Sequence, residues 1–552
     1  NIGAALMDMG LEKGASAAII GDNCPEWVMI DMGIQCAGGV SVGIYTTNAW
    51  QEVEYVVSNS EAVFLFVENE EQLDKWLNFR NNVPRLKKVI VWNTKGLRDF
   101  QDPMLMSLSE LIEKGKKLDK AALDQRTREI APDDMCVLIY TSGTTGPPKG
   151  AILTHGNVTW MAEAIAELNP MVEGDEVLSF LPLCHIFERL FSVFAHLRHA
   201  YVVNFVEKSD TVTDNMVEVS PTVGYAVPRI WEKYFSAIQI KMSEATRVKR
   251  LAYITALGIG RRRADLMMNF KKIPAWLELL FAAAHFAVFR QLKTRLGFER
   301  IRVAYSGAAP ISPKVLHFFQ SIGMNLIEGY GQTEGAGVTC TSRPGKAKFG
   351  AVGAPIPGTE VKIAEDGEIL VKSPGVFAGY YKNPEGTAET IRDGWPYSGD
   401  VGVIDEDGYL KITDRKKDII ITAGGKNISP QYIENMLKAS VYINDAVLIG
   451  DRRKYLVALI MIDEDNVVKF AQDNKIQFST YGDLARDPKI NALIQSEIDK
   501  VNQSLARVEN VRKFRILPKK LYEEDGEVTP TMKVKRKYVN KAFSDIIEEM
   551  YR

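Results

Sequence analysis

The sequence predicts an α/β protein with a large N-terminal domain of parallel α/β sheets and a smaller α+β C-terminal domain. Short β-branched runs alternate with segments of helical periodicity through residues 1–300, a pattern typical of parallel strands covered by helices. After Gly350, Gly and Pro cluster and the apolar runs become short and alternating, which favours a small antiparallel, β-barrel-like part. A further α/β block follows Lys417.

These patterns place the domains and the main elements. The length of 552 residues corresponds to three to four units of about 150 residues. We expect a large domain over 1–416, a lid domain over 417–552 and a hinge at Lys417. The expected strands are 17–21, 62–67, 88–92, 135–140, 177–181, 201–206, 222–227, 301–305 and 418–422. The segments 157–168 and 185–197 have helical periodicity.

Composition excludes several classes of protein. The chain has 68 Lys and Arg against 70 Asp and Glu, with 46% hydrophobic and 25% charged residues. These values are close to those of soluble globular proteins and exclude a disordered tail, a collagen-like fibre and a disulfide scaffold. The five cysteines form no C-x-x-C pair, which favours reduced thiols and a cytoplasmic location. We expect no nucleic-acid partner.

The segment 241–300 departs from this charge balance. It contains thirteen Lys and Arg against four Asp and Glu. Its longest apolar stretch, 273–289, is interrupted by Glu278 and His285 and is shorter than the roughly 20 residues that span a bilayer. The segment has two interpretations: a surface that docks peripherally at the inner face of a membrane, or an amphipathic helix pair packed on the body.

The most informative stretch is residues 140–150, YTSGTTGPPKG, which follows an apolar run. A loop rich in Ser, Thr and Gly presents hydroxyls and backbone N–H groups to an anion, and Lys149 adds a mobile positive charge. It is not a Walker A loop, because Pro148 stands where that motif requires Gly, and Gly150 replaces the Ser or Thr after the lysine.

This stretch resembles the phosphate loop, T-S-G-T-T-G-x-P-K-G, of the AMP-forming acyl-adenylate synthetases, the superfamily of acyl-CoA synthetases, luciferases and peptide-synthetase adenylation domains. The resemblance implies an acetyl-CoA synthetase-like fold and the substrates ATP and CoA, with Mg²⁺ as the metal. The residues implied to bind ATP here are Thr141, Ser142, Gly143, Thr144, Thr145, Gly146 and Lys149. Thr145 is also implied as a magnesium ligand.

Two further motifs follow in the family's order. Residues 305–310, YSGAAP, resemble the turn whose backbone lies along adenine, which marks Gly307, Ala308 and Ala309. Small residues suit this turn because a side chain would block a flat ring. Residues 328–334, EGYGQTE, resemble the Y-G-x-T-E motif. The roles implied there are adenine stacking by Tyr330 between Gly329 and Gly331, α-phosphate binding by Thr333 and magnesium binding by Glu334.

The remaining motifs lie towards the C-terminus. Asp400, in W-x-x-S-G-D, is implied to accept both ribose hydroxyls, and Arg415 is implied to contact the nucleotide. Gly425 lies in a loop implied to approach the CoA pantetheine. The closing motif around residues 529–536 implies Lys533 as the adenylation lysine, although Met532 replaces the usual Gly before it and Lys535 is a lesser candidate.

Two segments indicate the acid. His185, in LCHIFER, resembles the family residue near the reacting carboxylate, although a His on an apolar helix face also fits a packed core. Residues 227–233, VPRIWEK, match a segment of long-chain acyl-CoA synthetases. The resemblance therefore implies a long-chain fatty acid–CoA ligase, including bubblegum-like members. A long alkyl chain suits an apolar tunnel, because each buried methylene contributes about 0.8 kcal/mol.

Several alternatives stay open at this point. A fatty acyl-AMP ligase that loads a carrier protein shares these motifs, as does a CoA ligase for a medium-chain or aromatic acid. A luciferase-like oxygenase also shares them, whereas a non-catalytic lipid-binding protein would be expected to lose Glu334, Asp400 or Lys533. The oligomeric state is open, with a homodimer as one alternative. We expect the family's first strands and helices to precede Asn1.

Overall fold

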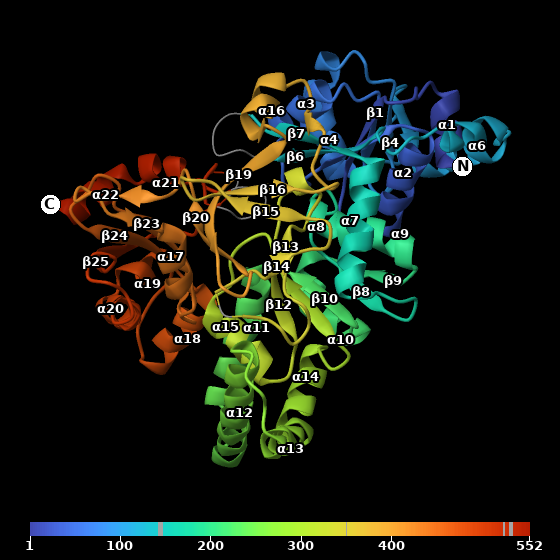
Figure 1. The fold of residues 1–552 in the computed structure, drawn as a ribbon. Coiled ribbons are helices and arrows are strands. Elements are labelled where there is room, and N and C mark those ends of the chain that lie inside the picture. Colours follow the sequence, from blue (N-terminus) through green and yellow to red (C-terminus); the bar gives the residue numbers. More distant parts are fainter. Residues whose placement is uncertain (142–146, 349, 523–524, 529–533) are drawn as a thin grey trace.

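The computed structural model describes residues 1–141, 147–348, 350–522, 525–528 and 534–552. Figure 1 shows a large body and a smaller C-terminal part, coloured orange to red, at its side. The body combines two mixed, mainly parallel sheets and a small antiparallel sheet. The predicted α/β architecture is therefore confirmed.

The first sheet has the order β17-β7-β6-β2-β1-β3-β4-β5 and is parallel from β6 to β5, with β7 and β17 antiparallel at one edge. Its central strands are buried on both faces and are accordingly mostly apolar. The strands are Ser16–Ile20 (β1), Val40–Ile44 (β2), Phe64–Val67 (β3), Lys88–Val91 (β4), Leu105–Ser107 (β5), Met135–Thr141 (β6), Lys149–Thr154 (β7) and Gly379–Tyr380 (β17). The accompanying helices are Ile2–Asp8 (α1), Pro25–Cys36 (α2), Trp50–Asn59 (α3), Glu70–Phe79 (α4), Leu108–Lys116 (α5) and Ala121–Arg128 (α6).

The second sheet has the order β10-β11-β12-β13-β14, parallel as far as β12. Its strands are Val223–Ala226 (β10), Val303–Ser306 (β11), Leu326–Tyr330 (β12), Cys340–Thr341 (β13) and Ala354–Pro355 (β14), and Glu176–Ser179 (β8) pairs separately with Val202–Phe205 (β9). The helices of this part are His155–Leu168 (α7), Ile186–Arg189 (α8), His196–His199 (α9), Val212–Val219 (α10), Pro228–Ser243 (α11), Arg247–Met268 (α12), Ala275–Ala284 (α13), Arg290–Leu296 (α14) and Pro313–Ser321 (α15). Two π-helical segments, Leu190–Ala195 (η2) and His285–Phe289 (η4), continue α8 and α13.

The small antiparallel sheet after Gly350 also matches the expectation. It contains Glu360–Ile363 (β15), Glu368–Lys372 (β16), Ile391–Arg392 (β18), Trp395–Ile404 (β19) and Leu410–Arg415 (β20), with Pro384–Thr390 (α16) beside it. The C-terminal part has the sheet Ile443–Ile449 (β23), Leu456–Ile462 (β24) and Val511–Ile516 (β25), and the hairpin Ile420–Ile421 (β21) and Asn427–Ile428 (β22). Its helices are Pro430–Lys438 (α17), Glu464–Asp473 (α18), Tyr481–Arg486 (α19), Pro488–Asn502 (α20), Arg536–Ala542 (α21) and Ser544–Tyr551 (α22).

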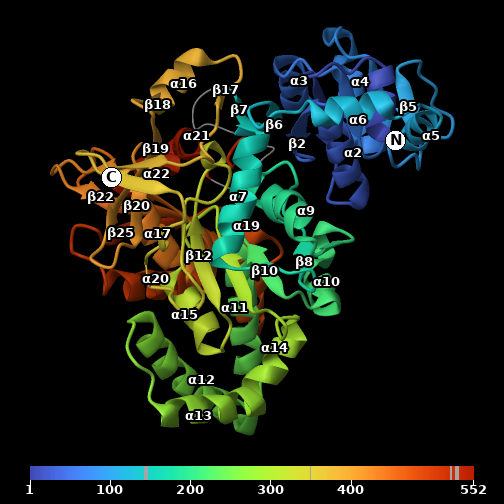
Figure 2. The same ribbon diagram turned by 45° about the vertical axis from the view of Figure 1, so that its right-hand side comes forward.

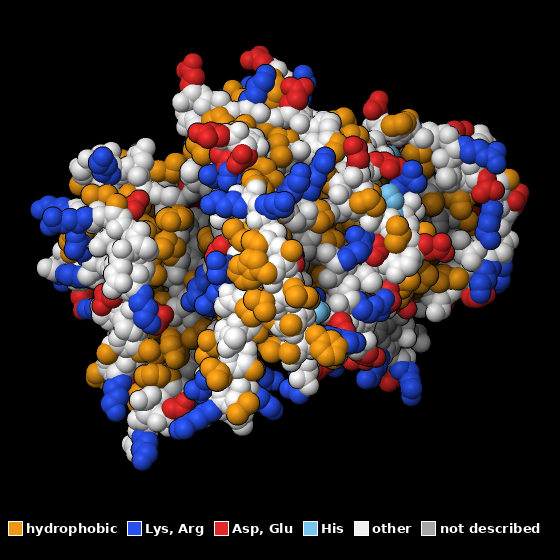
Figure 3. Space-filling model, turned by 60° about the horizontal axis from the view of Figure 1, so that its bottom comes forward, with side chains coloured by type: hydrophobic (Ala, Val, Ile, Leu, Met, Phe, Trp, Pro, Cys, Tyr) orange, Lys and Arg blue, Asp and Glu red, His pale blue; other side chains and the backbone are white. Residues whose placement is uncertain are grey.

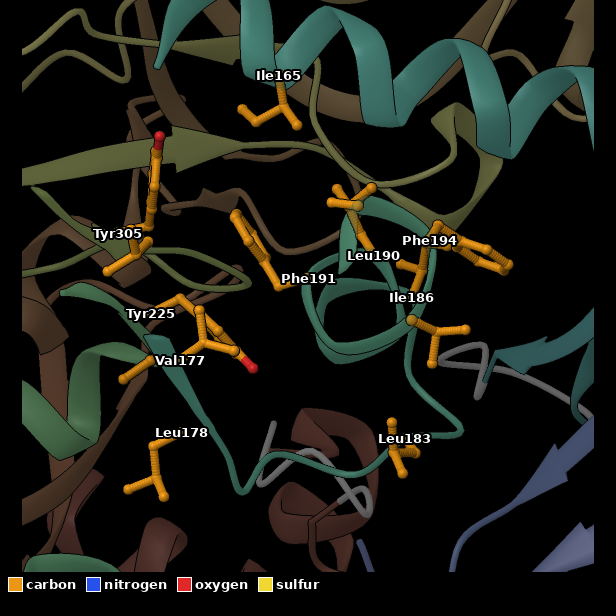
Figure 4. Close-up of a cluster of buried hydrophobic side chains, with 14 of the residues drawn as sticks. Ile165, Val177, Leu178, Leu183, Ile186, Leu190, Phe191, Phe194, Tyr225 and Tyr305 are labelled. Atoms are coloured by element: carbon orange, nitrogen blue, oxygen red, sulfur yellow. The ribbon is translucent and has the colours of Figure 1, made fainter. Parts of the chain in front are cut away.

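The body's core lies between its sheets and around the short helix α8. Figure 4 shows part of it, with side chains from α7, β8, α8, η2, β10 and β11 gathered in one cluster. There the Phe191 ring stacks on Tyr225, with ring centroids 4.7 Å apart, and also contacts Tyr305. The C-terminal sheet has separate apolar clusters on its two faces. The body therefore holds α8 rigidly by aromatic packing.

The helices α12, α13 and α14 form an arm that extends from the body, as Figures 1 and 2 show. Contacts of α12 with α15 and of α14 with α10 hold the arm to the rest of the body. Within the described ranges, the structure contains no helix that combines the length and apolarity needed to cross a bilayer.

Candidate active site

The phosphate loop connects two strands at the edge of the first sheet. Thr141 ends β6 and Lys149 begins β7, and the two residues are register partners. The Lys149 amine lies 5.1 Å from the centre of the Tyr380 ring, a cation–π contact that fixes the lysine at the loop's exit. The predicted ligands Ser142, Gly143, Thr144, Thr145 and Gly146 lie outside the described residues.

The predicted metal ligand Glu334 reaches the same region. It lies in a single turn of 3₁₀ helix, Thr333–Gly335, directly after β12, and Thr333 beside it is buried. The Tyr380 hydroxyl donates to Glu334 Oε1 at 2.6 Å. One ring thus contacts both Lys149 and Glu334, which brings two residues 185 positions apart in sequence to one site. Sequence reasoning did not identify Tyr380, because its role depends on β17 pairing with β7.

The donor set around Glu334 suits magnesium. Among the described residues no group of three or more His, Cys, Asp or Glu side chains could hold a metal. Mg²⁺ is typically bound through one or two carboxylates together with substrate phosphates and water. A single carboxylate held by Tyr380, whose ring also contacts Lys149, therefore fits a metal that arrives with a nucleotide.

Asp400 is the centre of a second cluster. It is buried, and its Oδ2 accepts hydrogen bonds from Tyr330 Oη at 2.8 Å and Gln332 Nε2 at 2.7 Å. Arg415 Nε lies 3.5 Å from the other carboxylate oxygen. The structure thus joins three predicted residues, Tyr330, Asp400 and Arg415, and adds Gln332.

A pocket opens between the two clusters. Its walls come from β12 and the turn after it, from the strand β16 and from the start of β19. The lining residues are Tyr330, Gln332, Glu334, Gly335, Thr339, Val371, Val376, Pro396 and Ser398. An aromatic ring, a buried carboxylate and apolar side chains are the groups that recognise a base and a ribose.

Close packing explains the small residues of the adenine motifs. A Cβ on Gly331 would lie 1.8 Å from the carbonyl oxygen of Gly337, so no larger residue fits there. A Cβ on Gly307 would lie 3.3 Å from the Phe187 ring. Ala308 has a positive φ of 67° and Ala309 is exposed, while Gly329 lies within β12. The Gly307 turn therefore meets the α8 region through Phe187.

His185 is placed by the start of α8 rather than by a helix face. It is the N-cap residue, and its Nδ1 accepts a hydrogen bond from the Phe187 backbone N–H at 3.2 Å. It follows the loop that leads from β8 into α8. The structure thus links His185 to the Gly307 turn through Phe187 and leaves the imidazole partly exposed.

The loop between β8 and α8 is bonded to a buried carboxylate, Glu188, which sequence reasoning did not identify. Glu188 is fully buried and accepts hydrogen bonds from the Leu181 N–H at 3.1 Å, the Ser192 hydroxyl at 2.6 Å and the Tyr225 hydroxyl at 2.9 Å. Burial raises the pKa of Glu188 to about 7. In the sequence, Glu188 is one acid on a short helix, and the signal would have been its position among apolar residues.

This raised pKa predicts the pH dependence of stability. Between about pH 4.5 and 7 the folded state keeps the Glu188 proton and the unfolded chain loses it, so stability falls as pH rises through this window. Glu188→Gln removes this effect. As the pH rises from 4.5 to 7.5, the variant's free energy of unfolding is expected to increase relative to the parent's by up to about 3 kcal/mol.

Urea unfolding across this pH range measures that difference. Burial also raises the pKa of Glu328 to about 7, but Glu328 titrates in both proteins and cancels in the comparison. A parent-to-variant difference that stays constant with pH contradicts the assignment.

Gly425 and Lys533 are the residues expected to act from the lid domain. Gly425 is exposed with a φ of 72° at the tip of the β21–β22 hairpin, and no described hydrogen bond joins it to the Asp400 cluster. Lys533 lies outside the described residues. Beyond it, Arg536 forms a partly buried bidentate ion pair with Glu434, at 2.8 and 2.9 Å, which holds Arg536 on α17.

The residues just before Lys417 are bonded both to the body and to the C-terminal part. Lys416 pairs with Asp366 at 2.5 Å and Glu368 at 2.7 Å on the small antiparallel sheet. Asp414 accepts from the Ser429 hydroxyl at 2.7 Å and the Gln431 N–H at 3.2 Å, at the start of α17. Lys417 itself is exposed and directly follows these two anchored residues.

Two family models cover most of the chain. The model of the AMP-binding enzyme family matches residues 1–381, and that of the AMP-binding enzyme C-terminal domain matches residues 417–552. The chain is 36% identical over 555 residues to the long-chain-fatty-acid–CoA ligase FadD15 of Mycobacterium bovis, which covers 99% of this chain and 89% of the relative. It is 34% identical over 577 residues to the long-chain-fatty-acid–CoA ligase ACSBG2 of Xenopus laevis, with 99% and 77% covered.

Solved structures share the fold at lower identity. The ATP-bound MatB of Rhodopseudomonas palustris matches with a TM-score of 0.68 and 21% identity, covering 99% of this chain and 92% of that one. The adenylation domain of a carboxylate reductase from Mycobacterium chelonae matches with a TM-score of 0.78 and 21% identity, covering 100% and 82%. The resemblance found in the sequence is confirmed, and the chain belongs to the family of AMP-binding enzymes.

Proposed function

We propose that this enzyme activates a long-chain fatty acid with ATP and transfers the acyl group to CoA. The observation that carries the proposal is the Asp400 cluster, which presents a ring, a carboxylate and a guanidinium next to Lys149 and Glu334. The names of the full-length relatives, which are long-chain-fatty-acid–CoA ligases, support the choice of acid.

In the first half-reaction a fatty carboxylate oxygen attacks the α-phosphorus of ATP, and the bond to pyrophosphate breaks. Asp400 would hold the ribose hydroxyls, while Tyr330 would stack on adenine beside Gly307. Thr333, Lys149 and Lys533 would stabilise negative charge on the transferring phosphoryl group. Magnesium held by Glu334 and Thr145 would supply further positive charge to the phosphates. The product is an acyl-adenylate.

In the second half-reaction the CoA thiol attacks the acyl carbonyl, and AMP leaves with the bonding electrons. The lid domain, residues 417–552, would turn about Lys417 to replace Lys533 by the Gly425 loop. Contacts just before Lys417 support a hinge here, because Lys416 is held by the body and Asp414 by the start of α17. His185 would lie near the reacting carboxylate.

Two further features complete the proposal. We propose peripheral contact with a membrane through residues 241–300, consistent with a substrate that partitions into bilayers, and a homodimer as one possible assembly. A fatty acyl-AMP ligase that loads a carrier protein is the second candidate, since it would use the same adenylation site.

The experiment that tests this function is AMP release across acids from C2 to C20, with and without CoA, and with an acyl carrier protein as the other acceptor. We expect the highest rate with long-chain acids and CoA. Release with carrier protein but not with CoA would favour the second candidate, and equal rates from C2 to C20 would contradict the choice of acid.

The two half-reactions can be separated by mutation. Lys533→Ala is expected to abolish acid-dependent ATP–pyrophosphate exchange and to spare thioester formation from supplied acyl-AMP. Gly425→Leu is expected to spare this exchange and to block thioester formation. Gly408→Leu is the matched control for backbone strain, since Gly408 also has a positive φ and open space around it. Retained exchange in the Lys533 variant would contradict its assignment.

A further inference from the structure

The outer face of α13 and η4 is apolar and exposed. Trp276 is 50%, Leu279 74% and Phe286 76% exposed, and Leu280 is also exposed. Their spacing places them on one side of the helix, where Ala283 and Ala287 continue the face. We call Trp276, Leu279, Leu280, Ala283, Phe286 and Ala287 the apolar stripe.

The opposite side of the same helix already packs on the arm and the body. Leu277, Ala284 and Phe289 are buried, and Phe281 contacts Gly323 at the end of α15. The helix is thus apolar on both sides, and its own chain covers only one of them. The interpretation as a helix pair simply packed on the body explains the inner side but not the stripe. A contiguous exposed apolar face of this kind marks an interaction surface.

Basic residues surround the stripe. Figure 3 looks onto this end of the molecule and shows a band of hydrophobic side chains with Lys and Arg on both sides. Lys271 and Lys272 precede α13, and the Arg262 guanidinium lies 5.2 Å from the centre of the Trp276 ring. In the described part of the chain, no ion pair involves Lys271, Lys272 or Arg262.

The acidic side chains of this arm already have partners. Glu278 pairs with Arg263 at 3.0 Å, Glu299 with Arg290 at 2.9 Å, and Asp265 contacts His317 at 3.0 Å. The arm therefore presents positive charge around an apolar centre. A second copy of this surface would meet like charge with like, which opposes self-association through the stripe.

We infer that the apolar stripe docks on an anionic lipid bilayer, with the helix axis parallel to the membrane plane. The stripe would enter the boundary between headgroups and acyl chains, and Lys271, Lys272 and Arg262 would contact anionic headgroups. This inference rests on the membrane contact in the proposed function and assigns that contact to one helix face. It gives the enzyme access to the phase in which long-chain fatty acids dissolve.

Co-sedimentation of the full chain with vesicles tests the inference. The vesicles are phosphatidylcholine alone or an equal mixture with phosphatidylglycerol, and neither ATP nor fatty acid is added. We expect binding to the mixed vesicles that weakens with salt. Leu279→Glu/Phe286→Glu and Lys271→Glu/Lys272→Glu are each expected to weaken this binding by roughly tenfold or more.

Matched controls change equally exposed residues elsewhere. Leu197→Glu alters an apolar residue that is 55% exposed on α9, and Lys117→Glu/Lys120→Glu reverses the same number of exposed charges. Both should bind like the parent. Equal binding by all variants, or a parent dimer that Leu279→Glu/Phe286→Glu dissociates in analytical ultracentrifugation, would overturn the inference. Because vesicle binding needs no turnover, loss of AMP release with every acid would contradict the proposed function and leave this result intact.

Discussion

Replacing Asp400 by Ala is expected to lower kcat/KM for ATP by about 10²- to 10⁴-fold. The carboxylate is buried, orients Tyr330 and Gln332 and faces Arg415. Two charge-assisted hydrogen bonds to ribose hydroxyls would be lost, each contributing about 1.5–3 kcal/mol. Arg415 would also lose its opposite charge at the nucleotide site.

The measurement is acid-dependent ATP–pyrophosphate exchange at several ATP concentrations. Asp407→Ala is the matched control, because Asp407 lies in the turn after the same strand and forms an exposed ion pair with Lys348. Tyr330→Phe separates orientation from direct binding, since it keeps the ring and removes only the hydrogen bond to Asp400. An Asp400 variant with the parent's KM for ATP would refute the ribose role.

Local signals allowed much of the fold to be predicted. The expected strand at 135–140 agrees with β6, Met135–Thr141, because six consecutive apolar or aromatic residues precede the loop. By contrast, β2 was not predicted, since Ser41 and Gly43 interrupt its apolar run. Ser41 is buried there because its hydroxyl accepts a hydrogen bond from Arg189, a contact 148 residues apart in sequence. The expected strand at 418–422 was too long, since β21 covers only Ile420–Ile421.

In the candidate site, too, some residues could be identified from the sequence alone, whereas others depend on the fold. Tyr330 and Thr333 could be identified from one contiguous motif, because five residues carry its signature. Gln332 lies inside that motif, yet its role becomes clear only when β19 brings Asp400 to it. Tyr380 and Glu188 depend on strand pairing and on packing against Tyr225, neither of which short-range periodicity encodes.

The buried ion pair between Asp31 and Arg189 joins three elements of the body's core. Both side chains are fully buried, and Arg189 bridges α8 to Asp31 on α2 and to Ser41 on β2, with Ser41 Oγ at 2.8 Å. Arg189→Met removes the cation and leaves the Asp31 carboxylate without its counter-charge. The free energy of unfolding is expected to fall by about 3–5 kcal/mol. Denaturant unfolding followed by tryptophan fluorescence is a direct measurement, because the Arg189 guanidinium lies over the Trp27 ring.

The double variant Asp31→Leu/Arg189→Met distinguishes a charge effect from lost packing. With no charge left in the core, it is expected to recover most of the stability lost in the single variant. Arg198→Met breaks an exposed ion pair with Glu163 nearby and should cost no more than about 1 kcal/mol. A double variant no more stable than the single one would assign the loss to packing on Trp27 and Phe194. Because Arg189 follows Glu188 on the helix that His185 caps, the single variant should also lose fatty-acid activation at denaturant concentrations where the parent and the double variant remain active.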